Sequence, residues 1–246
     1  MDTTTRRRRR RSTGLIAAAT VLAATALPAR PAGAITTSIP ITARVSAGPG
    51  NTQLPMGAYY DPHVDATGRY GFFTTPSKAI SSDGNSNEDV YRKDRLTGAL
   101  LRVSVMGEDQ QIAGKSVLCG TSSNGRYVGF QTTAATADLS NQVWRRDLTT
   151  RTTVRVTQPG AGAAPSTKCP ISDDGARIVY ESQAAGLGCG STSNVQVILR
   201  RMDNGTTTCL SVSTGGAVAN ALTGDTTISG SGDLVAFVSS ADNLVT

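Results

Sequence analysis

Four short apolar runs recur along the chain, and each follows a turn glycine and ends in an aromatic residue five positions after it. The runs occupy 69–73, 126–130, 176–180 and 233–237, after Gly68, Gly125, Gly175 and Gly232. These glycines are 57, 50 and 57 residues apart. Such self-similarity at a fixed period indicates a repeat architecture in which neighbouring units share a core.

A second pattern follows each of the first three runs. Residues 89–94, 142–147 and 197–201 are rich in β-branched and aromatic residues, and each leads through a polar turn into another short apolar segment. This pattern predicts a β-hairpin. With a short apolar segment before each glycine, every repeat contains four short strands. No useful helical periodicity appears after residue 34. The fold class is therefore all-β, a β-propeller of four-stranded antiparallel blades.

These motifs resemble the TolB-type, WD-repeat-like propellers of exported bacterial proteins. The matching segments are 123–130, 89–98, 102–105 and 237–245, and the resemblance covers roughly 41–246. It implies a scaffold with an interaction surface, and it carries no catalytic residues.

The repeats do not start and end at blade boundaries. We expect an outer strand at about 41–46, then blades at about 59–105, 115–157 and 167–213, with a partial blade at about 226–246. About three and a half blades would form an open arc, unless the first strand latches onto the last half-blade. We expect the chain to be a truncated or partial product of a longer propeller.

Residues 1–34 have the pattern of an export signal peptide. Six arginines precede an apolar stretch of roughly 13 residues, shorter than the ~20 that a membrane span needs. We expect cleavage after Ala34, a secreted or periplasmic location and no stable membrane span in the mature chain. An uncleaved anchor is the alternative, and the sequence leaves Sec and twin-arginine export open.

The basic charge of the chain belongs to this N-terminal segment. The formal net charge is +6, from 24 Lys and Arg against 18 Asp and Glu. Seven of the basic residues and one of the acidic residues lie within 1–34, so 17 of each remain in the mature chain. A nucleic-acid partner needs a basic surface, and we therefore expect none.

Four cysteines remain in the mature chain, and an exported protein permits disulfides. Cys119 and Cys169 each lie six residues before the glycine of their repeat, at equivalent places on adjacent first strands. We expect these two to pair, which leaves Cys189 for Cys209. The alternative is that some are free, buried thiols. With one histidine and no C-x-x-C motif, a structural zinc site is not expected.

One turn carries alternating oxygen side chains, at Asp83, Asn85, Asn87 and Asp89. This spacing resembles the start of a calcium loop, although Glu88 stands where glycine is expected and Asp94 replaces the bidentate glutamate. The alternative is a solvated turn, in which Asp and Asn are favoured in any case. No other cofactor is expected.

Two further features admit a functional interpretation. His63 is the single histidine, but no G-x-S-x-G motif accompanies it, and we expect a polar first-strand residue rather than a catalytic base. Basic pairs recur at 92–93, 145–146 and 200–201 on the third strand of each blade. They could form a basic stripe, but protection of an edge strand is the interpretation that we favour.

We therefore expect a non-enzymatic, exported propeller scaffold that binds an unknown protein or cell-envelope component. The alternatives are a hydrolase- or lyase-type propeller enzyme, an accessory propeller of a larger enzyme, and a carbohydrate-binding module. Aromatic residues are only 4% of the chain and are largely explained as strand core, which disfavours the last.

Overall fold

A computed structural model of the chain describes residues 44–57, 59–107, 109–133, 140–158, 168–184, 186–190 and 193–245. The chain divides into Met1–Thr42, which lies outside these residues, and the compact unit Ala43–Thr246. The predicted signal peptide, 1–34, is therefore outside the described part.

The described residues form strands joined by turns, with one short 3-10 helix, η1 (Pro49–Asn51). The first two sheets contain β1 (Tyr59–Val64), β2 (Tyr70–Thr75), β3 (Asp89–Asp94), β4 (Leu100–Arg102), β7 (Lys115–Thr121), β8 (Tyr127–Thr133), β9 (Ser140–Asp147) and β10 (Thr152–Arg155). The remaining strands are β5 (Val105–Met106), β6 (Gln110–Gln111), β11 (Arg177–Ser182), β12 (Gln196–Arg201), β13 (Thr207–Cys209), β14 (Thr223–Ile228) and β15 (Val235–Ser239).

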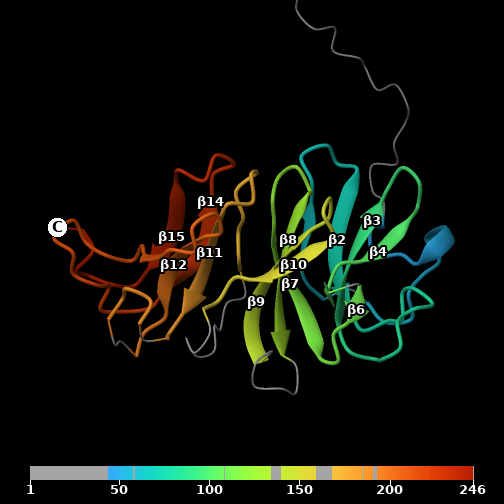
Figure 1. Ribbon diagram of the computed structural model, residues 1–246, viewed down its shortest axis with the longest axis horizontal. Helices are drawn as coiled ribbons and strands as arrows, with labels where there is room; N and C mark the ends of the chain where they lie inside the picture. Colours follow the sequence, from blue (N-terminus) through green and yellow to red (C-terminus); the bar gives the residue numbers. More distant parts are fainter. Residues whose placement is uncertain are drawn as a thin grey trace, which may run out of the picture. The chain divides into compact units, whose positions relative to one another are not determined.

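Each repeat of the sequence forms its own antiparallel sheet (Figure 1). Strands β1 to β4 and β7 to β10 make two four-stranded sheets in sequential order. The third sheet contains β11, β12 and β13, and the first strand of its repeat is reduced to a bridge between Ile171 and Ile178. Strands β14 and β15 form a two-stranded sheet. The predicted all-β class is confirmed, and so are four-stranded antiparallel blades in the first two repeats, whereas the third repeat forms three strands and a bridge.

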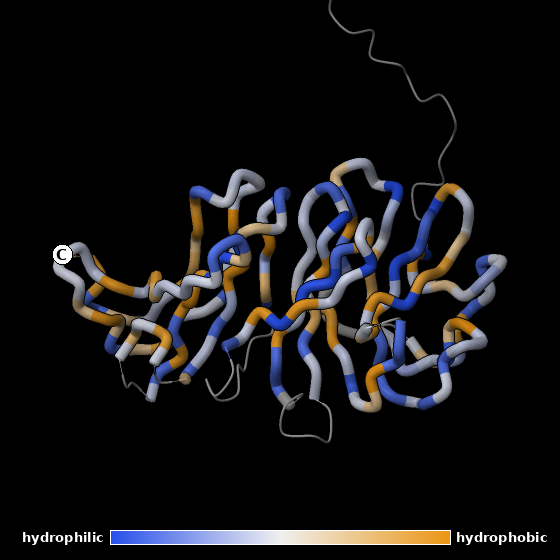
Figure 2. Tube along the Cα trace, in the orientation of Figure 1, coloured by the Kyte–Doolittle hydropathy of each residue, from blue (hydrophilic) through white to orange (hydrophobic). Residues whose placement is uncertain are grey.

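The second strand of each of the first three repeats is buried on both faces. Five consecutive residues are buried in β2 and in β11, and the first four residues of β8 are buried. The first apolar cluster joins Phe72 of the first sheet to Phe130 of the second. Another joins Tyr127 of the second sheet to Tyr180 of the third. Hydrophobic stretches of the trace accordingly lie along the strands (Figure 2).

The glycine turns are where adjacent sheets meet. Gly175 has φ +69°, and a Cβ atom built on it would lie 2.5 Å from Cε2 of Tyr127 in the preceding repeat. The positive φ favours glycine, and the close ring leaves no room for a side chain. The recurring glycine is therefore required both by the turn and by packing between sheets.

The arginine in the G-R-Y motif explains the aspartate that recurs at the end of the third strand. Arg69 Nη2 lies 2.7 Å from Asp94 Oδ2, and Arg126 Nη2 lies 2.7 Å from Asp147 Oδ2. In both pairs Nε also donates to the carboxylate, so the contact is bidentate. This ion pair joins the start of the second strand to the end of the third.

The edge-protection interpretation of the basic pairs is wrong. Strands β3, β9 and β12 each lie between two neighbouring strands of their sheet, so the pairs do not stand on an edge. Arg92 and Arg145 lie over the rings of Tyr70 and Tyr127, with the guanidinium carbon 4.5 Å and 5.0 Å from the ring centroids. These two guanidinium groups therefore pack on aromatic rings of the second strand and do not protect an edge.

The predicted outer strand at 41–46 is described only from residue 44. Residues 44–46 do not belong to a strand, and the nearest backbone pairing is the bridge from Ala47 to Gln53. Val45 instead packs against the apolar cluster of the first sheet, directly beside Gly71.

Candidate binding site between the first strands

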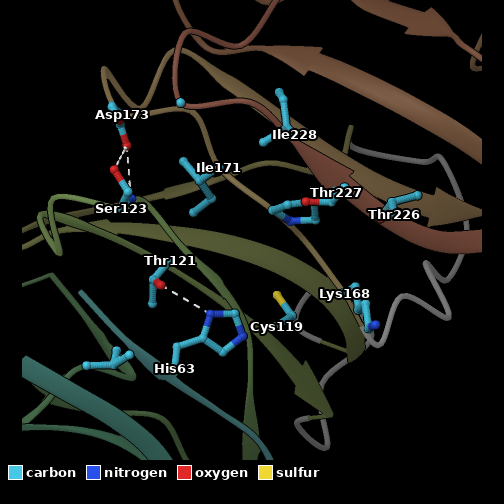
Figure 3. A pocket seen from close by; sticks show the side chains of 13 residues that line it. His63, Cys119, Thr121, Ser123, Lys168, Ile171, Asp173, Thr226, Thr227 and Ile228 are labelled. Carbon is cyan, nitrogen blue, oxygen red and sulfur yellow. Dashed lines mark hydrogen bonds between the residues drawn. The ribbon is translucent and has the colours of Figure 1, made fainter. Parts of the chain in front are cut away.

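The first strands of the four repeats line a cavity of about 430 Å³. We call it the first-strand cavity. Its walls come from β1, β7, the segment 168–173 and β14, so every repeat contributes to it (Figure 3). Its lining residues are His63, Val64, Cys119, Thr121, Ser123, Lys168, Pro170, Ile171, Asp173, Thr226, Thr227, Ile228 and Gly230.

His63 lies on β1 and is half-buried in this wall. Its Nδ1 is 3.1 Å from Oγ1 of Thr121 on β7, which links the first and second sheets. Asp65, the acid nearest in sequence, is engaged in its own turn, where its carboxylate accepts from the Tyr70 amide at 2.7 Å and from the Thr67 hydroxyl. This carboxylate is therefore held away from the role of orienting His63 as a base.

A chain of hydrogen bonds between successive turns forms one rim of the cavity. The amide of Ala66 donates to the Ser123 carbonyl at 2.6 Å, and the Asp173 amide donates to the Gly230 carbonyl at 2.8 Å. The Ser123 amide donates to Oδ1 of Asp173 at 2.9 Å, and the Ser123 hydroxyl donates to the same oxygen. The rim thus presents groups that are already fixed in direction.

The opposite side of the cavity carries a charged pair. Lys168 Nζ lies 2.6 Å from Oδ1 of Asp225 on β14. Behind β14, Glu181 is buried, and burial raises the pKa of its carboxyl. The cavity therefore combines hydroxyl groups, one imidazole and a lysine that is paired with a carboxylate with the apolar side chains of Ile171 and Ile228. Such a lining can recognise a ligand with both polar and apolar groups.

The structure contains two disulfides, and Cys119 of the first one lines the cavity. Cys119 and Cys169 are joined at an S–S distance of 2.05 Å, and Cys189 and Cys209 at 2.02 Å, the pairing expected from the repeat positions. The first disulfide ties β7 to the segment 168–173, where the Cys169 amide also donates to the Cys119 carbonyl at 2.7 Å. Two disulfides are typical of proteins that fold in an oxidising, extracytoplasmic compartment.

The predicted calcium loop folds as a polar network against the first sheet. The buried carboxylate of Asp83 accepts from Tyr91 Oη at 2.6 Å and from Gln111 Nε2 at 2.7 Å. Asp89 accepts from Ser104 Oγ at 2.7 Å and from Gln111 Nε2 at 2.8 Å. The Arg102 guanidinium lies 3.8 Å and 3.9 Å from the two carboxylates.

The two asparagines of this loop serve the backbone. The backbone N–H of Asn87 donates to Oδ1 of Asn85 at 2.9 Å, and the backbone N–H of Asn85 donates to Oδ1 of Asp83 at 3.3 Å. Their side-chain amides donate to the carbonyls of Ile112 and Ala113, both at 3.3 Å. Because these oxygens face protein donors and a guanidinium, the donor set does not fit a calcium ion. In the described part of the chain, no three His, Cys, Asp or Glu side chains are grouped to hold a metal.

Most residues that line the cavity have no recognisable signal in the sequence. Thr121, Lys168, Thr226 and Thr227 belong to no motif, because a strand that lines a cavity needs neither apolar periodicity nor a fixed spacing. His63 stands out in the sequence as the single histidine, and Cys119 by its place in the repeat, which is equivalent to that of Cys169. Only the stacking of the sheets brings these residues to one place.

Comparison with known proteins gives distant likenesses of fold. No family model and no curated protein matches the sequence. Among solved structures, the chain is similar to TolB from Acinetobacter baumannii, with 17% identity and a TM-score of 0.48 over 78% of this chain and 39% of that one. It is also similar to a putative TolB from Agrobacterium tumefaciens, with 17% identity and a TM-score of 0.47 over 78% of this chain and 59% of that one.

A third likeness is to the β-propeller domain of the trilobed protease from Pyrococcus furiosus, with 11% identity and a TM-score of 0.41 over 63% of this chain and 43% of that one. The chain thus spans 39% and 59% of the lengths of the two TolB structures. At such identities the likeness concerns the fold alone. None of the helices within the described residues is long and apolar enough to cross a membrane.

Proposed function

We propose that this chain is an exported, non-enzymatic propeller scaffold that binds a protein or another cell-envelope component in its first-strand cavity. The observation that carries the proposal is the lining of this cavity. Its polar groups bond to one another across the sheets: His63 to Thr121, Ser123 to Asp173, and Lys168 to Asp225. Groups held in this way are preorganised for recognition, because binding does not have to order them.

The chemistry of the lining supports binding more than catalysis. Hydrolases and lyases rely on a nucleophile beside a base, on convergent acids or on a metal cluster. Here Asp173 is held by the rim, and Lys168 faces a carboxylate. A disulfide-supported wall with Val64, Ile171 and Ile228 offers apolar contact between these polar groups.

Filling the cavity tests this proposal. Thr227 is exposed in the cavity, and Thr208 is exposed on the outer strand β13, so T227W and T208W are the same substitution inside and outside the site. The immobilised chain is exposed to envelope extracts, and captured components are identified by mass spectrometry. We expect wild type and T208W to capture the same components, and T227W to lose them.

Two outcomes would contradict the proposal. Capture by T227W at the wild-type level would mean that the cavity is not the binding surface. Turnover of peptide or polysaccharide substrates by wild type and T208W, abolished in T227W, would make the cavity an active site instead.

A further inference from the structure

One buried polar position recurs in the third strands of the first three repeats and is acidic only in the first of them. In the second and third repeats it holds Gln142 and Gln196, both buried. Each side-chain carbonyl accepts from a hydroxyl fifteen residues later in the chain, at 2.6 Å and 2.5 Å. Asp89 stands at the same position in β3 and accepts from Ser104 Oγ, also fifteen residues later, at 2.7 Å. A carboxylate therefore replaces a neutral amide in the first repeat.

Asp89 shares its surroundings with a second buried carboxylate, that of Asp83. Gln111 Nε2 donates to both, at 2.7 Å to Asp83 and 2.8 Å to Asp89, while its Oε1 accepts from the Gly84 amide at 2.9 Å. Among the described residues, the cation that faces this pair is Arg102, whose Nη1 lies 3.8 Å and 3.9 Å away, too far for a hydrogen bond. Because two carboxylates face one guanidinium, the buried group has an uncompensated negative charge that one proton neutralises.

The other titratable groups beside the pair do not supply the missing positive charge. Tyr91 Oη donates to Asp83 at 2.6 Å, and burial raises the pKa of this phenol, which therefore stays neutral. Glu88, the neighbour of Asp89 in the chain, is paired with Lys115 Nζ at 2.8 Å. Burial raises the pKa of the Asp89 carboxyl to about 6, which agrees with proton uptake by this group.

Gln111 ends the β5–β6 hairpin, which links the first two repeats. At the start of the hairpin, the Val105 carbonyl accepts from Thr153 Oγ1 on β10 at 2.7 Å. At its turn, Asp109 forms an ion pair with Arg146, a buried residue of β9. The second sheet therefore holds one part of the hairpin, and the carboxylate pair holds Gln111 at the other.

We infer that Asp83, Asp89 and Gln111 form a proton-operated latch that fastens the β5–β6 hairpin to the first sheet. Proton uptake by the carboxylate pair closes the latch, because burial then leaves no uncompensated charge. Loss of this proton opens it, because ionised carboxylates gain from hydration once Gln111 withdraws. The latch is independent of the first-strand cavity and of what binds there.

Hydrogen exchange of the whole chain, followed by mass spectrometry from about pH 5 to about pH 8, tests the latch. The measured quantity is the protection of the β5 and β6 amides, corrected for the intrinsic pH dependence of exchange. The bridge between Val212 and Val218 is the internal reference, since it is the equivalent hairpin of the third repeat. There Gln196, which does not titrate, donates to the Ala219 carbonyl at 3.1 Å.

In the wild type, we expect protection of β5 and β6 to fall about ten-fold from about pH 5 to about pH 7, with no such fall in the reference hairpin. The pKa of Asp89 is about 6 in the closed latch and near 3.8 when hydrated, so closure is favoured most below 3.8 and loses this contribution as the pH rises through 6.

The variant D83N should keep the latch closed over this whole pH range. Its Oδ1 can still accept from Gln111, its Nδ2 can donate to Tyr91 Oη, and one carboxylate then faces one guanidinium. Q111A should lower the protection of the hairpin at every pH. D203N, which neutralises an exposed acid of the third repeat, is the matched control and should behave as the wild type does.

Three results would overturn the inference. A fall of the same size in the Val212–Val218 hairpin would indicate a change in global stability. A D83N profile with the wild-type slope would mean that the charge of the pair is not the cause. Wild-type protection in Q111A would mean that this side chain does not hold the hairpin. The first comparison uses the wild type alone, so it decides the matter even if a variant fails to fold.

Discussion

At the residue scale, the spacing of the acidic loop, residues 83–89, predicts a calcium site, but the contacts of its side chains decide its chemistry. Asp89 is fully buried, and burial raises the pKa of its carboxyl to about 6, although Ser104 and Gln111 donate to it. Spacing could suggest a cation site at Asp83 and Asp89. It could not foresee that Tyr91 and Gln111 donate to these carboxylates or that the Arg102 guanidinium lies beside them.

This buried carboxyl predicts an unusual pH dependence of stability. Because its pKa is about 6 in the folded state and 3.8 in the unfolded state, folding favours the protonated form. The stabilising contribution is full below pH 3.8 and is lost as the pH rises through 6. We expect the free energy of unfolding to fall over this interval, as measured by urea titration of Trp144 fluorescence.

The substitution D89N should flatten this dependence, and the remainder should come from Glu181, whose pKa burial also raises. The matched control is D203N. The Arg201 guanidinium lowers the pKa of Asp203 to about 2, so this exposed group stays largely ionised above pH 4 or so. Equal slopes for wild type and D89N would contradict the assignment of the titration to Asp89.

At the element scale, the glycine turns both end the first strand and join the sheets. The sequence places them through their spacing, and the structure adds that the second, third and fourth turns lie against the preceding repeat. Gly125 lies beside Asp65 and Phe72, and Gly175 lies beside the ring of Tyr127. A turn signal alone therefore underestimates the importance of these positions.

We expect G175A to destabilise the chain more than G98A does. Both glycines have positive φ, +69° and +75°, and alanine in that region costs about 1 kcal/mol. Gly98 faces open space, whereas a Cβ at Gly175 meets the Tyr127 ring, and such overpacking costs roughly 1–3 kcal/mol more. Urea unfolding of both variants measures the difference, and equal losses would mean that the ring moves aside freely.

At the scale of the whole molecule, the disulfides differ in what they join. Cys119–Cys169 connects two sheets and spans 50 residues, whereas Cys189–Cys209 spans 20 residues within the third repeat. Together with the shared apolar clusters and the turn hydrogen bonds, the first disulfide holds the walls of the first-strand cavity in register.

We expect the paired variant C119A/C169A to lose more stability than C189A/C209A. From loop length, the chain-entropy contributions are about 4 and about 3 kcal/mol respectively. Urea unfolding under non-reducing conditions measures both losses. A larger loss from C189A/C209A would mean that the packing around that disulfide, rather than loop length, dominates its contribution.

Much of the architecture follows from the sequence itself. The glycine-to-aromatic spacing determined the second strands, the hairpin pattern determined the third and fourth, and equivalent repeat positions singled out Cys119 and Cys169. Such features are local or periodic, because strand alternation and turn formation depend on the identity of residues that are close together in the chain. The first strands were also expected from their apolar segments, but the polar residues with which they line the cavity belong to no motif, apart from His63.

Only the tertiary structure decided which of these residues meet. In the structure the basic pairs lie on central strands of their sheets and not on an edge. The carboxylates of the acidic loop contact Gln111 and Arg102. The tertiary structure also assembled a cavity from all four repeats. The physical reason is that strand pairing and sheet stacking join residues far apart in the chain. Their meeting depends on register and packing between sheets, which no single segment encodes.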